Sequence, residues 1–279
     1  MTRSIRPSSL TTYADCSRRW AARHLADDVA AAGYTLRPGR ALHIGAAVGG
    51  AIHAAAGYTM SSKRATGELG NEGEAIGRAE AEFEDRAQYG VTWDHTTSDL
   101  STAMKQITRM SKVYRRQVAP ELVPLVVEER FEADIGDDWQ ISGQIDTLAG
   151  DPDAIIEDLK TGTVQRANGV QYATYAMLFR AHGYRVTGIY EDFIRRVPIA
   201  HSQPPAEQHQ VDLEPAIADA WELIEAVKRD TAEFLSRVAD PHGKPPPNAF
   251  RANPASMLCS EKFCPAHSTD FCRAHRVAK

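Results

Sequence analysis

Two neighbouring apolar runs in the middle of the chain constrain its fold more than any other feature. Residues 141–148 and 154–159 are rich in β-branched and apolar side chains, and a turn containing Gly and Pro separates them. The pattern predicts two neighbouring strands. Because side chains alternate along a strand, Asp158 and Lys160 share one face of the second strand. If the strands pair, Asp146 can lie on that face too, so two carboxylates and an ammonium group converge at the edge of a sheet.

Such a group of side chains is suited to a metal site. Mg²⁺ and other hard divalent ions prefer oxygen ligands, and a small carboxylate cluster holds them while leaving positions open for water. A bound metal lowers the pKa of its water toward neutrality. A lysine beside that water can orient or deprotonate it and can offset the charge that develops on a phosphoryl oxygen. The group therefore indicates metal-assisted chemistry at phosphate esters.

The same residues form part of an ordered series. The series reads Gly143-x-x-Asp146, then Asp158-x-Lys160, then Gln171-x-x-x-Tyr175. An acid and a lysine two residues apart are usually no more than a solvated ion pair, but the full series resembles the PD-(D/E)xK nucleases of the RecB exonuclease branch. Ile145 stands where the family name has proline, a replacement that this branch commonly allows. Gln171 and Tyr175, four residues apart, share one face of a predicted helix over residues 168–183.

The resemblance implies a fold and an activity. The implied fold is α/β: a restriction-endonuclease-like core with a mixed sheet in the order α-β-β-β-α-β, extended by further helices and a C-terminal cluster-binding segment. The implied activity is metal-dependent exonuclease hydrolysis of phosphodiester bonds in DNA, on single strands or DNA ends, in recombination, repair or CRISPR-type adaptation. The chain contains no Gly-x-x-x-x-Gly-Lys-Ser/Thr motif, so any unwinding requires a helicase or recombination partner protein.

The resemblance also implies roles for individual residues. The implied ligands of one or two Mg²⁺ or Mn²⁺ ions are His53, Asp146, Asp158 and the carbonyl oxygen of Leu159. Lys160 is expected to assist the attacking water, and Gln171 and Tyr175 are expected to position the lysine and a phosphate. Together these residues form the candidate catalytic site.

His53 is singled out by the segment that carries it. Residues 44–60 are rich in Ala and Gly and predict a closely packed helix. Gly49 or Gly50 followed by His53 resembles the helix that brings a histidine to the metal in RecB-like nucleases. The alternative role of a solitary histidine on such a helix is a hydrogen-bonded packing residue. The acidic partners found further along the chain favour metal ligation.

The cysteines lie at the two ends of the chain. All four are Cys16, Cys259, Cys264 and Cys272. One early cysteine and three late ones resemble the arrangement in AddB-type and CRISPR-adaptation nucleases, where the four thiolates bind a [4Fe–4S] cluster that joins the chain ends. The late cysteines are separated by four and seven residues, where the family often has two and five. Structural zinc, with His267 or His275 replacing one thiolate, and free thiols are the alternatives.

The remaining apolar patterns predict the order of elements and one domain. Predicted helices cover residues 8–32, 44–60, 68–88, 98–118, 168–183 and 215–238, and predicted strands cover 123–135, 139–148, 154–159, 186–195 and 208–213. We expect a single nuclease domain over residues 1–279. It would comprise a helical part at 1–120, a catalytic sheet core at 121–213 and a C-terminal helix with the cysteine segment at 214–279.

The composition places few further limits on function. Lys and Arg number 32 against 37 Asp and Glu, a formal net charge of −5. An acidic balance gives no support to nucleic-acid binding, but carboxylates at a metal site raise the acid count and a local basic channel is enough to hold phosphates. The sequence has no apolar run of membrane-spanning length and no signal segment, so we expect a cytoplasmic protein without membrane contact.

One predicted helix is unusually basic. It carries Lys105, Arg109, Lys112, Arg115 and Arg116. These cations could border a DNA channel, or they could form an ordinary solvated helix face. The sequence favours neither alternative.

Two further functions fit the same resemblance. The first is a non-catalytic DNA-binding or scaffold subunit of a nuclease complex, which would be marked by loss of the acid or lysine positions. Asp146, Asp158 and Lys160 are all retained here. The second is an assembly module whose cysteine cluster serves only as a docking surface.

Overall fold

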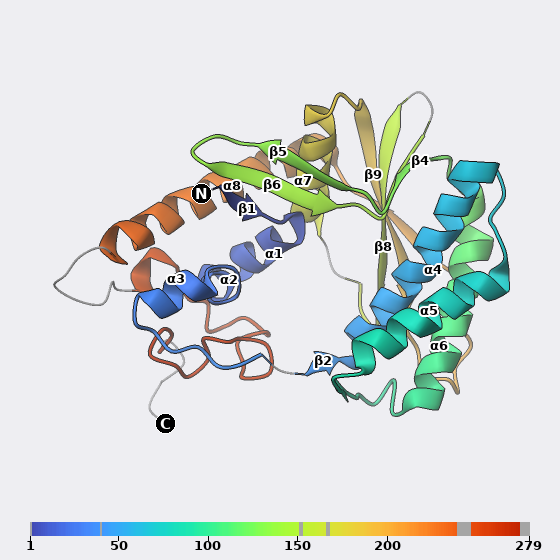
Figure 1. Cartoon of the computed structure of the whole chain (residues 1–279), viewed down its shortest axis with the longest axis horizontal. Helices are drawn as coiled ribbons and strands as arrows, with labels where there is room; N and C mark the ends of the chain where they lie inside the picture. Colours follow the sequence, from blue (N-terminus) through green and yellow to red (C-terminus); the bar gives the residue numbers. More distant parts are fainter. Residues whose placement is uncertain (1, 40, 151–152, 166–167, 239–246, 274–279) are drawn as a thin grey trace. The chain divides into compact units, whose positions relative to one another are not determined.

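The computed structural model (Figure 1) describes residues 2–39, 41–150, 153–165, 168–238 and 247–273. The chain divides into two compact units. Residues 41–133 and 142–216 form the central unit, and residues 1–40, 134–141 and 217–279 form the terminal unit. The sequence-based expectation of a single domain, with its three parts, stays a prediction.

A five-stranded mixed sheet organises the central unit, in the order β10-β9-β8-β7-β4. Its strands are β4 (Pro124–Val127), β7 (Thr147–Ala149), β8 (Ala154–Gly162), β9 (Val186–Arg195) and β10 (Glu207–Gln210). β8 and β9 are parallel and the other pairs are antiparallel. Helix α7 (Gly169–Ala181) connects the parallel pair, as a parallel connection requires. The predicted α/β class and the α-β-β-β-α-β order with a mixed sheet are thereby confirmed.

Three helices pack together on one face of this sheet, two of them directly against its strands. They are α4 (Ile44–Thr66), α5 (Glu72–Ala87) and α6 (Leu100–Val113), with a π-helical turn at Tyr114–Val118. A side-chain cap begins each of them, since the side chains of His43, Asn71 and Asp99 accept hydrogen bonds from the Gly45, Glu74 and Thr102 amides. The helices share one apolar core with four buried residues of the sheet, namely Val127, Ala149, Leu159 and Ile194. Figure 1 shows α4, α5 and α6 gathered beside β8.

The two strands predicted on either side of the hairpin at residue 136 are each broken in two. β4 ends before Glu128, and β5 (Arg130–Asp134) begins after it; β6 (Trp139–Gln144) ends before Asp146, and β7 follows. The prediction of continuous strands over 123–135 and 139–148 was therefore wrong. The physical reason is local backbone geometry: Glu128 has a positive φ of 51°, and its amide donates to the Asp146 carbonyl at 3.2 Å.

These breaks separate two sheets. β5 and β6 belong to a three-stranded sheet in the order β1-β6-β5, in which β1 (Arg3–Ile5) pairs in parallel with the first residues of β6. β4 and β7 instead join the five-stranded sheet. A further small sheet pairs β2 (Leu42–His43) with β3 (Val91–Thr92).

The terminal unit is helical around an aromatic core. Its helices are α1 (Pro7–Asp15), α2 (Ser17–His24), α3 (Ala26–Ala31) and the greater part of α8 (Leu213–Val238). The single helix predicted over residues 8–32 was wrong, because Cys16 adopts an extended backbone (φ −160°, ψ 100°) between α1 and α2. The Phe250 ring packs against Trp20 and Phe234, with ring centroids 6.3 Å and 5.5 Å apart. Within the described ranges, no helix is both long and apolar enough to traverse a bilayer.

The core of the central unit leads to a stability prediction. Ile52 of α4 has no exposed surface, so Ile52→Ala leaves a cavity and should lower the free energy of unfolding by about 2–5 kcal/mol. Leu100, at the first position of α6, is 54% exposed, and Leu100→Ala should stay within about 0.5 kcal/mol of the unchanged protein. Urea unfolding of both variants measures the difference. Equal stabilities would contradict the placement of α4 in the core.

Candidate active site

Three potential metal ligands meet where the two strands break. His53 on α4, Glu128 after β4 and Asp146 after β6 offer ligand atoms that all lie within 4.8 Å of one another. His53 Nδ1 lies 3.0 Å from Asp146 Oδ1, and the Gln144 amide donates to Glu128 Oε2 at 2.7 Å. Two carboxylates and one imidazole nitrogen are a donor set that Mg²⁺ or Mn²⁺ accepts.

Asp158 and Lys160 lie next to this group on β8. The Asp158 side chain is only 3% exposed and forms an ion pair with the Lys160 ammonium. Between them, the Leu159 amide donates to Asp146 Oδ2 at 2.9 Å. The fold thus brings together His53, Asp146, Asp158 and Lys160. The predicted use of the Leu159 carbonyl oxygen as a ligand stays a prediction.

The carboxylates of the site are more numerous than the cations that can neutralise them. Burial raises the pKa of Asp158 to about 6, although Lys160 opposes the shift. Burial and the charge of Asp146 raise the pKa of Glu128 to about 7. Burial disfavours the charged form of His53, but Asp146 outweighs burial and raises the histidine pKa. A divalent cation among these groups would remove the repulsion between them, so the residues present fit a divalent metal ion.

Lys160 is held from the α7 side of the sheet. Its Nζ lies 5.4 Å from the centroid of the Tyr172 ring, and the Tyr172 hydroxyl donates to the Glu191 carboxylate. Burial acts to lower the pKa of Lys160, but the charges of Asp158 and then Asp146 raise it. The lysine is therefore cationic and fixed in place, as a group that stabilises anionic charge must be.

Gln171 and Tyr175 both lie on the buried face of α7, and each is 7% exposed. Burial, followed by the charges of Asp158 and Asp146, raises the pKa of Tyr175, and the Gln171 side chain hydrogen-bonds to it. Tyr175 therefore lies within electrostatic reach of the acidic site. The aromatic side chain stacked on Lys160 is Tyr172, and the roles of Gln171 and Tyr175 stay predictions.

The sequence reasoning missed Glu128 and Tyr172. Glu128 follows the apolar residues of β4 directly, but the apolar pattern resumes after it, so the break that turns its side chain toward the site has no clear sequence signal. Tyr172 directly follows Gln171 in the recognised series, and its position on the face toward β8 becomes evident only from the packing of α7.

The four cysteines of the terminal unit line one cavity, together with His267 and Arg19. Burial raises the pKa of the Cys259 and Cys264 thiols. Cys264 and Cys272 are 7% and 6% exposed. The fold thus gathers residues from both ends of the sequence. His275 lies outside the described residues.

An arginine is buried beside these thiols. Arg19 is 2% exposed, its guanidinium pairs with Asp15 at 2.6 Å, and its Nε has no hydrogen-bond partner among the described residues. Its charge acts to lower the pKa of Cys259 and of Cys264, against the effect of burial. Burial outweighs the arginine, so the pKa of both thiols stays raised, and Arg19 limits the rise.

Basic side chains of α6 and of the π-helical turn form hydrogen bonds and ion pairs within the central unit. Arg109 donates to the Ile199 carbonyl at 3.0 Å, and Arg115 donates to the Leu69 and Gly70 carbonyls at 2.6 Å. Lys112 and Arg116 both pair with Glu72. These contacts favour a structural role for the basic helix over the border of a DNA channel.

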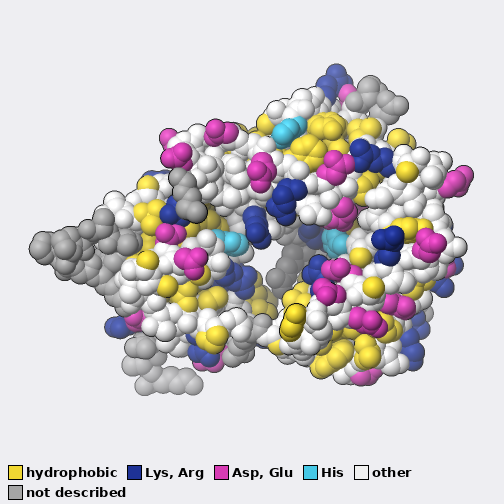
Figure 2. Space-filling view, in the orientation of Figure 1, with side chains coloured by type: hydrophobic (Ala, Val, Ile, Leu, Met, Phe, Trp, Pro, Cys, Tyr) yellow, Lys and Arg dark blue, Asp and Glu magenta, His cyan; other side chains and the backbone are white. Residues whose placement is uncertain are grey.

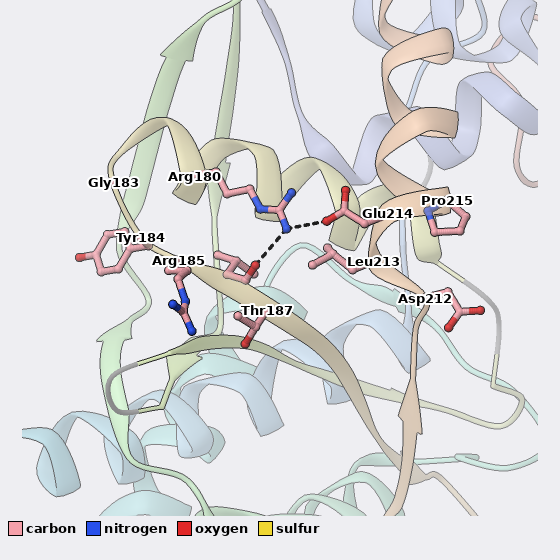
Figure 3. A pocket seen from close by; sticks show the side chains of 10 residues that line it. Arg180, Gly183, Tyr184, Arg185, Thr187, Asp212, Leu213, Glu214 and Pro215 are labelled. Carbon is pink, nitrogen blue, oxygen red and sulfur yellow. Dashed lines mark hydrogen bonds and ion pairs between the residues drawn. The ribbon is translucent and has the colours of Figure 1, made fainter.

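One hollow of the central unit lies away from the candidate ligands (Figure 3). It has a volume of about 1010 Å³ and is lined by the α7–β9 turn and the first residues of α8. Arg180 in it is paired with Glu214 at 2.8 Å and with the Val186 carbonyl at 3.0 Å. Arg185 is paired with Asp153 at 2.7 Å. None of the predicted site residues lines this hollow.

Comparison with known proteins identifies the family. No curated protein matches the chain. The chain is similar to the crystal structure of SSO0001, with 12% identity, a TM-score of 0.31 and coverage of 63% of this chain and 73% of that one. It is also similar to LHK-Exo in complex with dAMP, with 13% identity, a TM-score of 0.30 and coverage of 68% and 94%. Both likenesses are too low to carry an argument. A family model described as the PD-(D/E)XK nuclease superfamily matches residues 4–270, and the chain therefore belongs to that superfamily.

Proposed function

We propose that this protein is a metal-dependent DNA exonuclease of the RecB-like branch, which hydrolyses phosphodiester bonds in single strands or at DNA ends. The observation that carries the proposal is the meeting of His53, Glu128 and Asp146 beside the Asp158–Lys160 ion pair. Membership of a nuclease superfamily supports hydrolysis of DNA. Retention of all the charged positions supports catalysis over the alternative of a scaffold subunit.

The proposed metal ligands are the two carboxylates Asp146 and Asp158, the His53 imidazole and the Leu159 carbonyl, with Glu128 as an additional carboxylate. When bound, Mg²⁺ or Mn²⁺ supplies a water of lowered pKa and neutralises charge on the phosphate. The Leu159 amide holds Asp146 in orientation through its hydrogen bond at 2.9 Å. Gln144 does the same for Glu128.

Lys160 has the proposed role of orienting the attacking water and stabilising charge on the phosphoryl oxygen. Its ion pair with Asp158 and its position over Tyr172 support this role, because both restrict the ammonium to one place. Gln171 and Tyr175 are proposed to position the lysine and a phosphate from α7.

The cysteines are proposed to bind a [4Fe–4S] cluster. All four cysteines line one cavity of the terminal unit. Four thiolates in one cavity are the ligand set of a [4Fe–4S] cluster or of a structural zinc, and the family resemblance favours the cluster. Zinc with His267 as a ligand remains the alternative to be tested.

The proposed biological setting is recombination, repair or CRISPR-type adaptation. The absence of a Gly-x-x-x-x-Gly-Lys-Ser/Thr motif from the sequence supports dependence on a helicase or recombination partner where duplex DNA must be unwound.

The first prediction tests the metal site and the reaction. Uniformly labelled linear and circular DNA, single- and double-stranded, should show release of nucleotides from the linear substrates alone, and only when Mg²⁺ or Mn²⁺ is added. Asp146→Asn and Asp158→Asn remove a charged ligand without changing shape, so cleavage should be lost while the fold is kept. Divalent metal should raise the Tm of the unchanged protein more than that of either variant.

Two outcomes would overturn this assignment. Unchanged turnover in Asp146→Asn or Asp158→Asn would show that these carboxylates are not metal ligands. Cleavage of circular DNA at the rate of linear DNA would replace exonuclease action by endonuclease action.

The second prediction separates the chemistry of Lys160 from binding. Lys160→Ala should lower kcat by about 10²–10³-fold and leave DNA affinity nearly unchanged, because the lysine acts on charge that develops in the transition state. Lys112→Ala, an equal loss of charge on α6, should keep the original kcat. Loss of affinity with an unchanged maximal rate would instead make Lys160 a phosphate anchor.

The third prediction concerns the cysteine cavity. Anaerobically purified protein should be brown, with a broad shoulder of visible absorbance and stoichiometric iron and sulfide. Substitution of any one cysteine by Ser should bleach the colour and lower the Tm, because metal binding that joins distant parts of the chain stabilises the folded state. Colourless, folded protein with one zinc per chain would replace the cluster by a zinc site, and four alkylatable thiols without metal would remove both.

A further inference from the structure

A groove opens beside the candidate metal ligands, between α4 and α5 of the central unit. Its volume is about 750 Å³, within the range of pockets that hold ligands. Small residues of α4, namely Gly50, Ala54 and Gly57, line it at helical spacing. His53 and Glu128 line it as well, so the groove leads directly to the candidate metal site.

At two glycine positions along this groove, neighbouring side chains occupy the space that a larger residue of α4 would need. A Cβ at Gly50 would overlap the side chain of Arg86, and a Cβ at Gly57 would lie 3.0 Å from Glu128 Cγ. With glycine at both positions, the arginine and the glutamate lie directly against the helix. The two side chains therefore form part of the floor of the groove at these positions.

The α5 wall of the groove carries two arginines in different states. Arg86 Nε is paired with Glu82 Oε1 at 2.5 Å. Arg78 has no carboxylate within ion-pair distance among the described residues, and its guanidinium lies 4.9 Å from the centroid of the Tyr58 ring. The Tyr58 hydroxyl donates to Glu74 Oε2 at 2.5 Å, which fixes the ring beneath the arginine. Arg78 is thus an oriented cation with no acidic partner in the groove.

An arginine stacked on an aromatic ring matches two parts of a nucleic-acid strand. The guanidinium fork can donate two parallel hydrogen bonds to a phosphate. The exposed faces of the guanidinium and ring can stack on a nucleobase. A duplex hides its base faces within the stack, so only an unpaired strand can use both contacts.

The charges around the pair also favour one strand. Glu82 and Asp85 lie on the same wall, and Figure 2 shows acidic and basic side chains interspersed over α5 in place of a continuous basic surface. Carboxylates repel phosphates, so a phosphate in the groove is directed to Arg78. A second backbone alongside would face those carboxylates.

We propose that this groove binds the unpaired strand of the DNA substrate next to the metal site, with Arg78 on a backbone phosphate and the Tyr58–Arg78 pair stacked on an adjoining base. The inference rests on the proposed function for its catalytic centre, and it adds the substrate class: single-stranded DNA. Tyr58 and Arg78 are residues that neither the family series nor the metal site includes.

The test is binding of a labelled oligothymidylate, and of a blunt duplex of equal length, in Ca²⁺ without cleavage. Arg78→Ala should weaken oligothymidylate binding about tenfold and reduce the salt slope by about 0.7, the value for one phosphate contact to a single strand. Tyr58→Leu keeps an apolar side chain but removes the ring, and should weaken binding about tenfold with an unchanged salt slope. Duplex binding should change little in either variant.

Arg116→Ala is the matched control. It removes the same charge from the α6 side of the unit, where Arg116 pairs with Glu72, and should bind oligothymidylate as the unchanged protein does. Arg78 is exposed, so its variant should keep the original Tm. Unchanged oligothymidylate affinity in Arg78→Ala, or an equal loss in Arg116→Ala, would overturn the inference.

The binding assay also separates this inference from the proposed function. Oligothymidylate binding that depends on Arg78, in a protein that cleaves no DNA with Mg²⁺ or Mn²⁺, would support the groove and refute the exonuclease. Cleavage of single-stranded DNA with an affinity that Arg78→Ala does not alter would support the exonuclease and refute the groove.

Discussion

The crowding of carboxylates in a half-buried place is the constraint on which the central unit depends. In the part of the chain that the structure describes, His53 and Lys160 are the counter-charges that Glu128, Asp146 and Asp158 face, and burial raises the pKa of Glu128 and of Asp158. Taking such groups out of water costs free energy that their mutual contacts do not return. The apolar core that α4, α5 and α6 share with the sheet stabilises the central unit and offsets this cost. Carboxylates that are buried together at such a cost indicate a site that binds a cation.

The positions of Asp158 and Lys160 follow from the alternation of side chains along a single strand. The positions of Glu128 and Asp146 depend on tertiary packing, because both residues lie where strands break. Asp158 and Lys160 share a face because β8 is regular, and β9 spans the predicted residues 186–195 for the same reason. The apolar pattern gives no warning of the breaks at Glu128 and Asp146. The two breaks lie opposite each other, where the Glu128 amide donates to the Asp146 carbonyl between the two arms of the hairpin. Hence the series predicted Asp146 but not Glu128.

In the terminal unit, too, sequence periodicity does not reveal where an element ends. Helical spacing continues through residues 8–32, so sequence predicts one helix, but the backbone is extended at Cys16. The Arg18 amide, at the start of α2, donates to the Arg251 carbonyl at 3.2 Å, a contact with a segment far along the chain. Periodicity within one segment cannot reveal such a contact. The gathering of the cysteines was accessible only through family resemblance, since nothing in their spacing fixes which thiols meet.

The carboxylate cluster and the cysteine cluster both place ionisable groups where burial disfavours their charged forms. In each cluster, neighbouring basic side chains offset part of that effect. At the carboxylates, Lys160 and His53 supply some positive charge but leave three acids crowded. At the cysteines, burial favours the neutral thiol, while Arg19 acts in the opposite direction on Cys259. Because metal ligation requires thiolates, metal uptake there must release protons, and a buried guanidinium reduces the cost of that release. Under the proposed assignment, Arg19 therefore belongs to the cluster electrostatically, as Lys160 belongs to the metal site, although neither is a ligand.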